Sequence, residues 1–495
     1  MTRTLRSLLL AASLAPALAP AQDRPSEEEL FGTPPASEPG GPQDGQAAAK
    51  DQQGQAPPAG PARPEEEELF GAQGSPNALP APPDRLIERS RREVLSVGGQ
   101  LYLRLDASAY DTGQAREWPL ASPNLLDVYL DARPNDRVRG FVQGRLSYDP
   151  TAPAEAGPGL PGSAGTSSDV TGVLDQLWVN FDVGRTAFVT AGKQHAKWGT
   201  GKFWNPTDYL HPVRRDPLAV YDVRQGTPLL KLHLPWEKRG WNFQGVLMFQ
   251  DLAGDLRQPT DRVGRVAAGG RAEIVLGPAE LGLDGMVQDG RDARFGVDVS
   301  GGLWDLDLHA EASLRNGTDG PHYAWNGSSW VRDDLTGFTP QVVGGATWSA
   351  NYSDEDAVTV GAEYFYNAAG YEDAGVYPTL LTSAALSQDA SGFQPFYLGQ
   401  HYLGLYVLLP SPGPWNDTTF TLSVIGNLSD RSTIVRLDHS VLALTYLRVE
   451  TYVAGHLGQK GGEFRFALPP EIAAAADLPS GAPVIDVGVA ARINL

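Results

Sequence analysis

Alternation of apolar and polar residues recurs from Leu95 to the end of the chain, and it limits the possible folds more than any other feature. In the first such segment Leu101, Leu103 and Leu105 alternate with Arg104 and other polar residues. A period of two residues is typical of a β-strand with one apolar and one polar face. The pattern predicts eighteen strands, near 95–109, 125–133, 137–149, 173–183, 186–194, 228–235, 241–250, 266–276, 280–288, 294–300, 303–315, 340–352, 357–366, 399–410, 417–426, 432–442, 447–457 and 484–495.

The joins between these segments alternate between tight and long. The joins at 134–136 and 301–302 are tight, whereas those at 150–172 and 195–226 are long. A transmembrane barrel of the bacterial type has an even number of strands, short turns at one end and long loops at the other. A water-soluble sandwich has no reason to keep this parity. We therefore predict an all-β fold, a transmembrane antiparallel up-and-down β-barrel over residues 95–495, with both chain ends in the periplasm.

Composition agrees with a barrel and argues against several other classes of protein. Only 41% of residues are hydrophobic and the mean hydropathy is -0.27, which suits a barrel with a polar inner face and not a helical membrane protein. The chain has no cysteine, so disulfide and thiol chemistry are excluded, and its net charge of -20 argues against a nucleic-acid partner. The sequence contains no recognised metal-binding motif, and we expect no metal site and no cofactor.

The first residues have the pattern of a secretory signal peptide. Arg3 and Arg6 precede an apolar core at 8–18, and small residues follow it. The apolar run is shorter than the roughly 20 residues that a membrane-spanning helix needs. We expect residues 1–21 to be a signal peptide that is cleaved after Ala21.

Residues 22–83 are rich in Pro, Ala, Gly, Gln and Glu and contain few large apolar residues, so we expect a disordered periplasmic tail. The string EEELFG occurs twice in this tail, at 27–32 and 66–71. The two copies are either short docking peptides for a periplasmic partner or duplicated low-complexity sequence. A short helix or connector over 84–94 is expected to join the tail to the barrel. The apolar residues that would dock are Leu30, Phe31, Leu69 and Phe70.

The stretch Thr186–Val220 changes from an alternating strand into a loop. Gly199 and Gly201 free the backbone there, and Pro206 cannot donate a ladder hydrogen bond. Because external display would leave several large aromatic side chains in water, we expect loop 195–226 to fold into the pore as a constriction. Its rings would offer flat faces to a sugar or an aromatic solute, and its cations would favour anions or neutral polar solutes. The expected constriction residues are Lys197, Trp198, Lys202, Trp204, Asn205, Asp208, Tyr209, Arg214 and Arg215.

The polar phases of the strands are expected to face the lumen. Basic and acidic walls on different parts of the circumference would give a transverse field that filters polar solutes. The alternative is that inward charges pair across neighbouring strands, which we favour for Asp127, Asp131 and Arg133. The charged residues expected in the lumen are Arg139, Arg145, Asp298, Asp305, Asp307 and Glu311.

Two stretches resemble parts of known outer-membrane proteins. The last segment, VIDVGVAARINL, places Val487, Val489 and Ile493 in one phase with the terminal Leu495. It resembles the C-terminal strand by which the barrel-assembly machinery recognises its substrates, although that strand usually ends in an aromatic residue. The stretch GKQHAKWGTGKFWNPTD resembles a strand-to-loop junction of poorly characterised porin-like proteins. Residues 95–495 thus resemble bacterial outer-membrane porins, which implies a Gram-negative outer membrane, surrounding lipid and passive diffusion of small hydrophilic solutes.

Two other functions stay open at the level of sequence. A structural or partner-binding barrel that docks a periplasmic protein through its acidic tail is favoured by the repeated string, and a stably co-purifying periplasmic protein would distinguish it from a free pore. An outer-membrane esterase or phospholipase also lives on a barrel. The one tight grouping, Asp438, His439 and Ser440, has neighbours on opposite faces of a strand. We therefore expect no enzyme and no catalytic residues.

Overall fold

The computed structural model describes residues 94–111, 118–151, 170–211, 213–249, 266–288, 291–318, 320–353, 356–387, 393–467 and 480–495. The expected signal peptide, the tail and its docking residues lie outside the described residues, and so does the expected connector apart from Val94.

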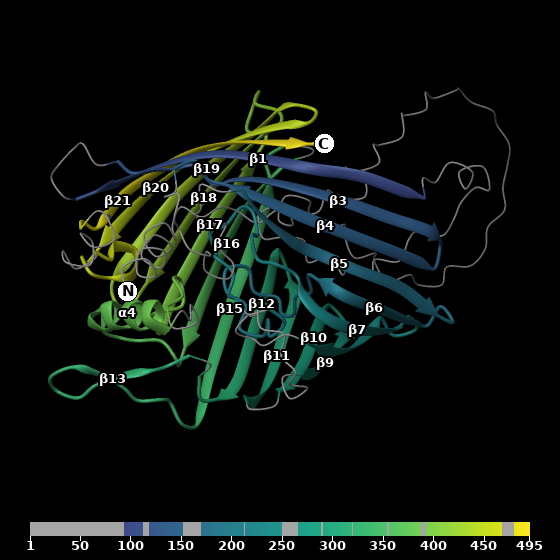
Figure 1. The fold of residues 1–495 in the computed structure, drawn as a ribbon, viewed down its shortest axis with the longest axis horizontal. Helices are drawn as coiled ribbons and strands as arrows, with labels where there is room; N and C mark the ends of the chain where they lie inside the picture. The colour runs from purple at the N-terminus through teal and green to yellow at the C-terminus, as the bar shows by residue number, and fades with distance from the viewer. Residues whose placement is uncertain are drawn as a thin grey trace.

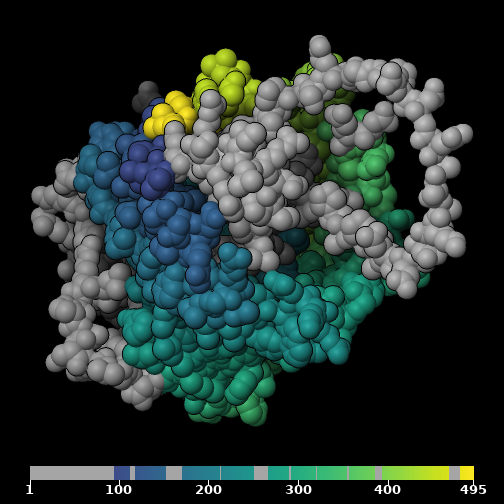
Figure 2. Space-filling view, turned by 90° about the vertical axis from the view of Figure 1, so that its right-hand side faces the viewer, coloured from purple at the N-terminus to yellow at the C-terminus, as the bar shows by residue number. Residues whose placement is uncertain are grey.

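Eighteen long strands form one closed antiparallel barrel within the described residues. Figure 1 shows the strands side by side in chain order, and in the end view of Figure 2 the colours follow one another around the molecule until yellow meets purple. The last strand closes the ring on the first, with Gln100 opposite Asn494 and Ala109 opposite Ile485. The predicted fold is confirmed, and every predicted segment matches a strand to within three residues at each end. The barrel strands are β1 (Leu95–Tyr110), β3 (Asn124–Asn135), β4 (Val138–Tyr148), β5 (Thr171–Val183), β6 (Ala187–Gln194), β7 (Thr227–Trp236), β8 (Trp241–Met248), β9 (Ala267–Leu276), β10 (Ala279–Gln288), β11 (Arg291–Leu303), β12 (Leu306–Asn316), β15 (Phe338–Asn351), β16 (Ala357–Asn367), β17 (His401–Pro410), β18 (Thr418–Asn427), β19 (Ser432–Leu444), β20 (Leu447–Gly458) and β21 (Pro483–Asn494).

Side chains on these strands point alternately inward and outward. On β1, Leu103 and Leu105 are exposed whereas Arg104 and Asp106 are buried, and on β3 the apolar Val128 is likewise exposed. Polar residues therefore line the inside, and apolar residues form the outer surface. A closed barrel satisfies every ladder hydrogen bond internally, so this outer surface is suited to lipid, and the fold is that of a transmembrane β-barrel.

The joins between strands separate into two kinds at the two ends of the barrel. At one end, here called the turn end, joins such as 136–137 and 277–278 are tight, and the chain enters β1 and leaves β21 there. At the other, the loop end, the joins include 195–226, 368–400 and 459–482, with short joins only after β10 and β18. Exposed aromatic residues gather in or beside the tight turns, as in an interfacial girdle. These residues are Trp236, Trp304, Trp415 and Tyr446.

A few short elements that the sequence pattern did not predict lie outside the ring. The two-residue strand β2 (Leu120–Ala121) pairs with β1. At the loop end, β13 (Tyr323–Trp325) and β14 (Trp330–Arg332) form a hairpin. The join 368–400 contains η3 (Ala374–Val376) and α4 (Tyr377–Ser387), and the join 459–482 contains η5 (Glu463–Arg465). In Figure 1 the hairpin and α4 lie beyond the strand ends on the same side. No helix among the described residues is both long and apolar enough to cross a membrane.

The orientation of the two ends gives a testable prediction. Cysteine placed at Ser328, at the exposed tip of the β13–β14 hairpin, should react with a membrane-impermeant maleimide on intact cells. Cysteine at Asn135, beside the turn after β3, should react only after the outer membrane is opened. Because the natural chain has no cysteine, each variant carries a single label. Labelling of Asn135→Cys on intact cells would show that the barrel has the opposite orientation.

Candidate functional site

The join 195–226 between β6 and β7, here called the inward loop, lies inside the barrel against the inner faces of several strands. Its irregular path depends on glycine at two positions. Gly199 has φ of 89°, and a Cβ there would meet Asn205 Oδ1 at 2.1 Å. A Cβ on Gly201 would stand 1.8 Å from the carbonyl oxygen of Trp204, so only glycine permits this close approach.

Two glutamates of the barrel wall bind the backbone of this loop. Glu311 on β12 accepts hydrogen bonds from the N–H groups of Thr200, at 3.0 Å, and Gly201, at 3.1 Å. It also accepts the N–H of Thr207 at 2.6 Å. A carboxylate that accepts several backbone N–H groups compensates donors that a loop inside a barrel would otherwise leave unsatisfied.

Glu363 on β16 binds the next three residues of the loop in the same way. Its carboxylate accepts the N–H groups of Lys202 at 2.7 Å, Phe203 at 3.1 Å and Trp204 at 2.8 Å. His309 Nε2 lies 2.9 Å from the same carboxylate. Since β16 is eight strands around the ring from β6, the loop crosses the interior almost to the opposite wall.

The aromatic residues of the inward loop are anchors. Trp204 is 0% exposed, its ring lies 5.5 Å from those of Phe365 and Tyr402, and its Nε1 donates to the carbonyl oxygen of Phe396 at 3.0 Å. Trp198 packs in a second buried cluster with residues of β7 to β10. These rings are buried in the protein, and so is Tyr209. The expectation that they offer faces to a solute is therefore wrong for this arrangement, because their apolar area is already removed from water by the barrel wall.

The second half of the inward loop returns along another part of the wall. Tyr221 stacks on Tyr102 of β1 with ring centroids 5.7 Å apart, and its hydroxyl donates to Asp127 of β3. Arg145 of β4 donates to both the Tyr221 hydroxyl and Asp127. Leu218 packs in a buried cluster with side chains of β18, β19 and β20. The loop is thus held on several sides of the ring.

The four cations expected at the constriction come together around one small cavity of about 20 Å³. Arg214 donates to Gln341 Oε1 at 3.2 Å and to the carbonyl oxygen of Asn205 at 3.3 Å. The amide nitrogen of Asn205 is buried and has no hydrogen-bond partner among the described residues. The cavity is lined by Lys197, Lys202, Arg214, Arg215, Arg224, Asn205, Asp208 and Tyr397, together with Gly201, Phe203 and Val213.

Neighbouring charges shift the pKa values of several groups around this cavity. Partial burial and the nearby Arg215 lower the pKa of Lys197 to about 8. Burial alone would raise the pKa of Asp208, but His211 and Arg224 hold it below its ordinary value. The Asp208 carboxylate lies 3.0 Å from His211 Nδ1 and 3.4 Å from Arg224 Nη1. The acid at the cavity is therefore ionised and paired, and Lys197 is the cation whose charge changes near neutral pH.

The lumen charges predicted from the strand phases lie mostly in local ion pairs. Arg139 donates to Asp131 and Arg145 to Asp127, each through two nitrogens at 2.8–2.9 Å. Asp298 binds Arg271 at 2.6 Å. The expectation of separate basic and acidic walls is wrong for these groups, because oppositely charged partners stand side by side on neighbouring strands. The alternative, local pairing, holds for Asp127, Asp131 and Arg133. Asp127 pairs with Arg145, and Asp131 pairs with both Arg133 and Arg139.

Two of the predicted acids lie near the turn end. Asp305 is in the tight turn between β11 and β12, so its expected place on an inward strand face is wrong. Asp307 follows on the inward phase of β12 but is exposed. Glu311 is inward, as expected, and is one of the two glutamates that accept N–H groups of the inward loop.

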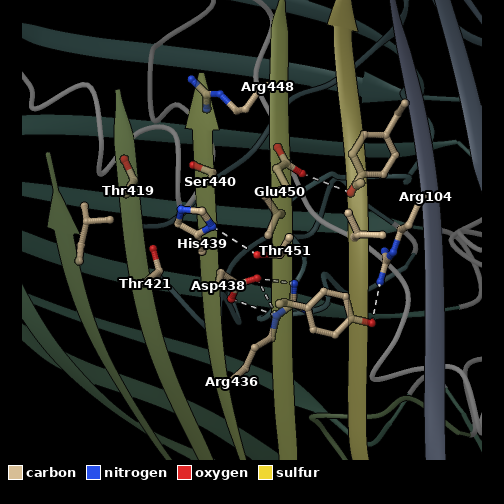
Figure 3. A pocket seen from close by; sticks show the side chains of 16 residues that line it. Arg104, Thr419, Thr421, Arg436, Asp438, His439, Ser440, Arg448, Glu450 and Thr451 are labelled. Carbon is tan, nitrogen blue, oxygen red and sulfur yellow. Dashed lines mark hydrogen bonds and ion pairs between the residues drawn. The ribbon is translucent and has the colours of Figure 1, made fainter. Parts of the chain in front are cut away.

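A second cavity of about 70 Å³ lies on the inner wall formed by β18 to β21 and β1, and Val220 of the inward loop lines it. Figure 3 shows Arg436 paired with Asp438, whereas Arg104 and Glu450 contact tyrosine hydroxyl groups. Arg436 binds Asp438 at 2.6 Å, and the Arg436 guanidinium lies 4.1 Å from the centroid of the Tyr452 ring. His439 Nδ1 lies 3.3 Å from Thr451 Oγ1, so the drawn contacts join no serine, histidine and aspartate in a catalytic chain. Among the described residues no three His, Asp or Glu side chains are grouped so as to hold a metal ion.

Sequence reasoning missed four residues of this site: Glu363, Arg224, Phe396 and Tyr397. Glu363 was detectable in part, because it shares the inward phase of β16 with Phe365. Nothing in the local pattern shows that the backbone of residues 202–204, about 160 positions earlier, is its partner.

Comparison with known proteins adds little beyond the fold. No family model matches the sequence, and no curated protein matches it. Among solved structures, OccAB1 of Acinetobacter baumannii is 13% identical with a TM-score of 0.49, and the match covers 81% of this chain and 97% of that one. OccAB3 of the same organism is 9% identical with a TM-score of 0.47, covering 81% and 99%. A triple mutant of the Rhodopseudomonas blastica porin is 12% identical with a TM-score of 0.38, covering 81% and 100%. At these values the likenesses carry no argument of their own, and the architecture rests on the strand pairing.

Removal of Glu363 should release the inward loop. In Glu363→Ala three loop N–H groups lose their acceptor, so trypsin should cut the folded barrel after Lys197 or Lys202 roughly tenfold faster than in the natural protein. Glu363→Gln, which keeps one acceptor oxygen, should lie between the two. Mass spectrometry of the fragments measures the rates.

The matched control is Asp307→Ala, which removes another inward carboxylate, near the turn end and away from the loop. It should leave the loop as resistant as in the natural protein. Equal cleavage of Glu363→Ala and the natural protein would show that the carboxylate does not hold the loop.

Proposed function

We propose that the barrel is a bacterial outer-membrane channel for passive diffusion of small hydrophilic solutes, with the inward loop as its constriction. The observation that carries this proposal is the cavity at which Lys197, Lys202, Arg214 and Arg215 meet. Arg224 adds a fifth cation to its lining. Fixed charges in a narrow, partly dehydrated passage act on a passing ion more strongly than the same charges in bulk water.

The local charge, and not the net charge, sets the proposed selectivity. The whole chain carries -20, but charges farther away than a Debye length, about 8 Å at physiological ionic strength, are largely screened. The acid beside the cations, Asp208, is already paired with His211 and Arg224. An ion at the cavity therefore meets a positive surface, and we expect anions or neutral polar solutes to pass in preference to cations.

The polar groups at the cavity favour hydrated or hydrogen-bonding solutes. The Asn205 amide nitrogen, which lacks a partner among the described residues, is a donor for such a solute. A volume of about 20 Å³ is about the space that one water molecule occupies, so a larger solute crosses only when the lining side chains move. The wall of the second cavity, which carries Arg104, Arg436 and Arg448 beside Asp438 and Glu450, would offer further polar contacts to such a solute.

A second candidate is a structural or partner-binding barrel that docks a periplasmic protein through its acidic tail. The repeated EEELFG string is the observation that favours it. A channel and a docking tail are compatible, because the tail precedes the barrel in the chain and the proposed constriction lies within the barrel.

Neutralising the cation cluster should change ion selectivity. With Lys197, Lys202, Arg214 and Arg215 all replaced by Gln, the zero-current potential of the refolded barrel in a salt gradient should shift towards cation preference. The control replaces four exposed cations at the turn end, Arg137, Arg185, Lys238 and Arg239, by Gln, and alters the net charge equally. A shift in the control as large as in the cluster variant would place selectivity outside the inward loop.

Anion preference should also depend on pH. Because the pKa of Lys197 is about 8, its charge is present below that pH and is lost as the pH rises through it. Zero-current potentials measured between pH 6 and 10 should therefore lose part of their anion preference with a midpoint near 8. Lys197→Arg keeps its charge over this range and should remove the transition. A transition that persists unchanged in Lys197→Arg would assign it to another group.

A further inference from the structure

One residue joins the inward loop to the loops at the outer mouth. Phe396, in the join between β16 and β17, accepts the Trp204 indole N–H on its carbonyl oxygen and donates its own N–H to Glu463. Its φ of 70° is uncommon for a residue with a side chain. This backbone conformation persists only where the surroundings stabilise it. Here the N–H and the carbonyl oxygen of Phe396 are both hydrogen-bonded.

Glu463 lies in the join between β20 and β21 and is itself held by the barrel wall. Its carboxylate accepts hydrogen bonds from the Tyr402 hydroxyl of β17 at 2.6 Å and from the Asn427 amide of β18 at 2.8 Å. Its own N–H donates to Asp430 at 2.7 Å. Asp430 also accepts the Tyr377 hydroxyl of α4 at 2.8 Å. The joins after β16, β18 and β20 thus meet at one pair of carboxyl groups.

The same outer segment touches the cation-bearing part of the inward loop. The Tyr397 hydroxyl donates to the carbonyl oxygen of Arg215 at 3.2 Å, and the Arg214 guanidinium lies 5.7 Å from the centroid of the Tyr397 ring. Trp204 and Tyr397 each lie against Phe365 of β16. Residues 396–397 are therefore the direct physical link between the outer loops and the proposed constriction.

We propose that Glu463 is a positioning residue that holds the inward loop in its narrow arrangement through Phe396, so that release of Glu463 loosens the constriction from outside. This proposal rests on the proposed channel, because it assigns a regulator to the same loop. Loosening of the inward loop would be the movement that a solute larger than water needs in order to pass.

The surroundings of Glu463 make this hold sensitive to pH. The groups that face it are Asp430, Tyr402, Tyr377 and Asn427, while Arg465 on its own element turns to Asp111 at 3.1 Å. Burial, followed by the charge of Asp430, raises the pKa of Glu463 from 4.5 to about 8. A raised pKa means that the held state binds the proton more tightly than a released state does. The hold is therefore strongest below pH 4.5 and weakens as the pH rises towards 8.

The test measures hydrogen exchange at the amides of residues 200–205, 207 and 396 in the full-length protein in lipid nanodiscs, at pH 5 and pH 8.5, corrected for intrinsic exchange rates. In the natural protein, exchange should be roughly tenfold faster at the higher pH. Glu463→Gln, which cannot ionise, should stay protected at both values. Glu463→Ala, which lacks the acceptor, should exchange fast at both. The matched control is Glu372→Gln, an exposed glutamate of the outer join that carries Phe396, and it should behave as the natural protein.

Glu463→Gln keeps one acceptor oxygen for the Phe396 N–H and nearly the same side-chain size, so it tests the proposal even if Glu463→Ala does not fold. Exchange in Glu463→Gln that follows pH as in the natural protein would overturn the proposal, and so would natural protection in a folded Glu463→Ala. Exchange does not depend on conduction. If the variants behave as expected but the natural protein carries no current in a bilayer, the channel fails and the positioning role of Glu463 stands.

Discussion

Six backbone N–H groups of one loop donate to two carboxylates of the barrel wall, and the arrangement of the interior depends on this contact. Glu311 accepts from Thr200, Gly201 and Thr207, and Glu363 accepts from residues 202–204. A loop inside a barrel has no ladder partner, so each of these donors needs an acceptor, and a hydrogen bond to a charged group contributes about 1.5–3 kcal/mol. Glu311 projects from β12 and Glu363 from β16, six and eight strands around the ring from β6, so together they carry the loop across the lumen.

The remaining contacts follow from that crossing. Once residues 200–207 lie against the far wall, Trp204 reaches Phe365 and Tyr402, and its indole N–H reaches the carbonyl oxygen of Phe396. The aromatic rings are then enclosed, and the side chains that turn to open space are mainly the cations and Asn205. The apolar part of the loop thus fixes its position, and in the proposed channel the charged part would determine what a solute meets.

The barrel was predictable from sequence because strand alternation and tight turns are local signals. In β1 and β16 a few residues are enough to distinguish the inward from the outward face. The alternation of tight and long joins then assigns each join to one end of the barrel. The inner contacts were not predictable in the same way. Glu363 and the N–H groups it accepts are about 160 residues apart, and no local pattern records such a pairing. The rings of Trp198 and Trp204 were expected to face a solute, but burying their large apolar surface against the wall is the stronger effect. Short elements such as the β13–β14 hairpin and α4 were missed because they are stabilised by packing among the joins at the loop end, and neither has a sequence period of its own.

The central claim is that side chains of the inward loop line the path of permeating ions, and covalent block of a single channel tests it most directly. Lys202→Cys introduces the only cysteine of the chain at the cation cavity. A methanethiosulfonate reagent added to an open channel of this variant should reduce the single-channel current in one step that persists after the reagent is washed out and that a thiol reductant reverses. Labelling that goes to completion, shown by mass spectrometry of the recovered protein, with no change in current would contradict the claim and place the loop outside the conducting path.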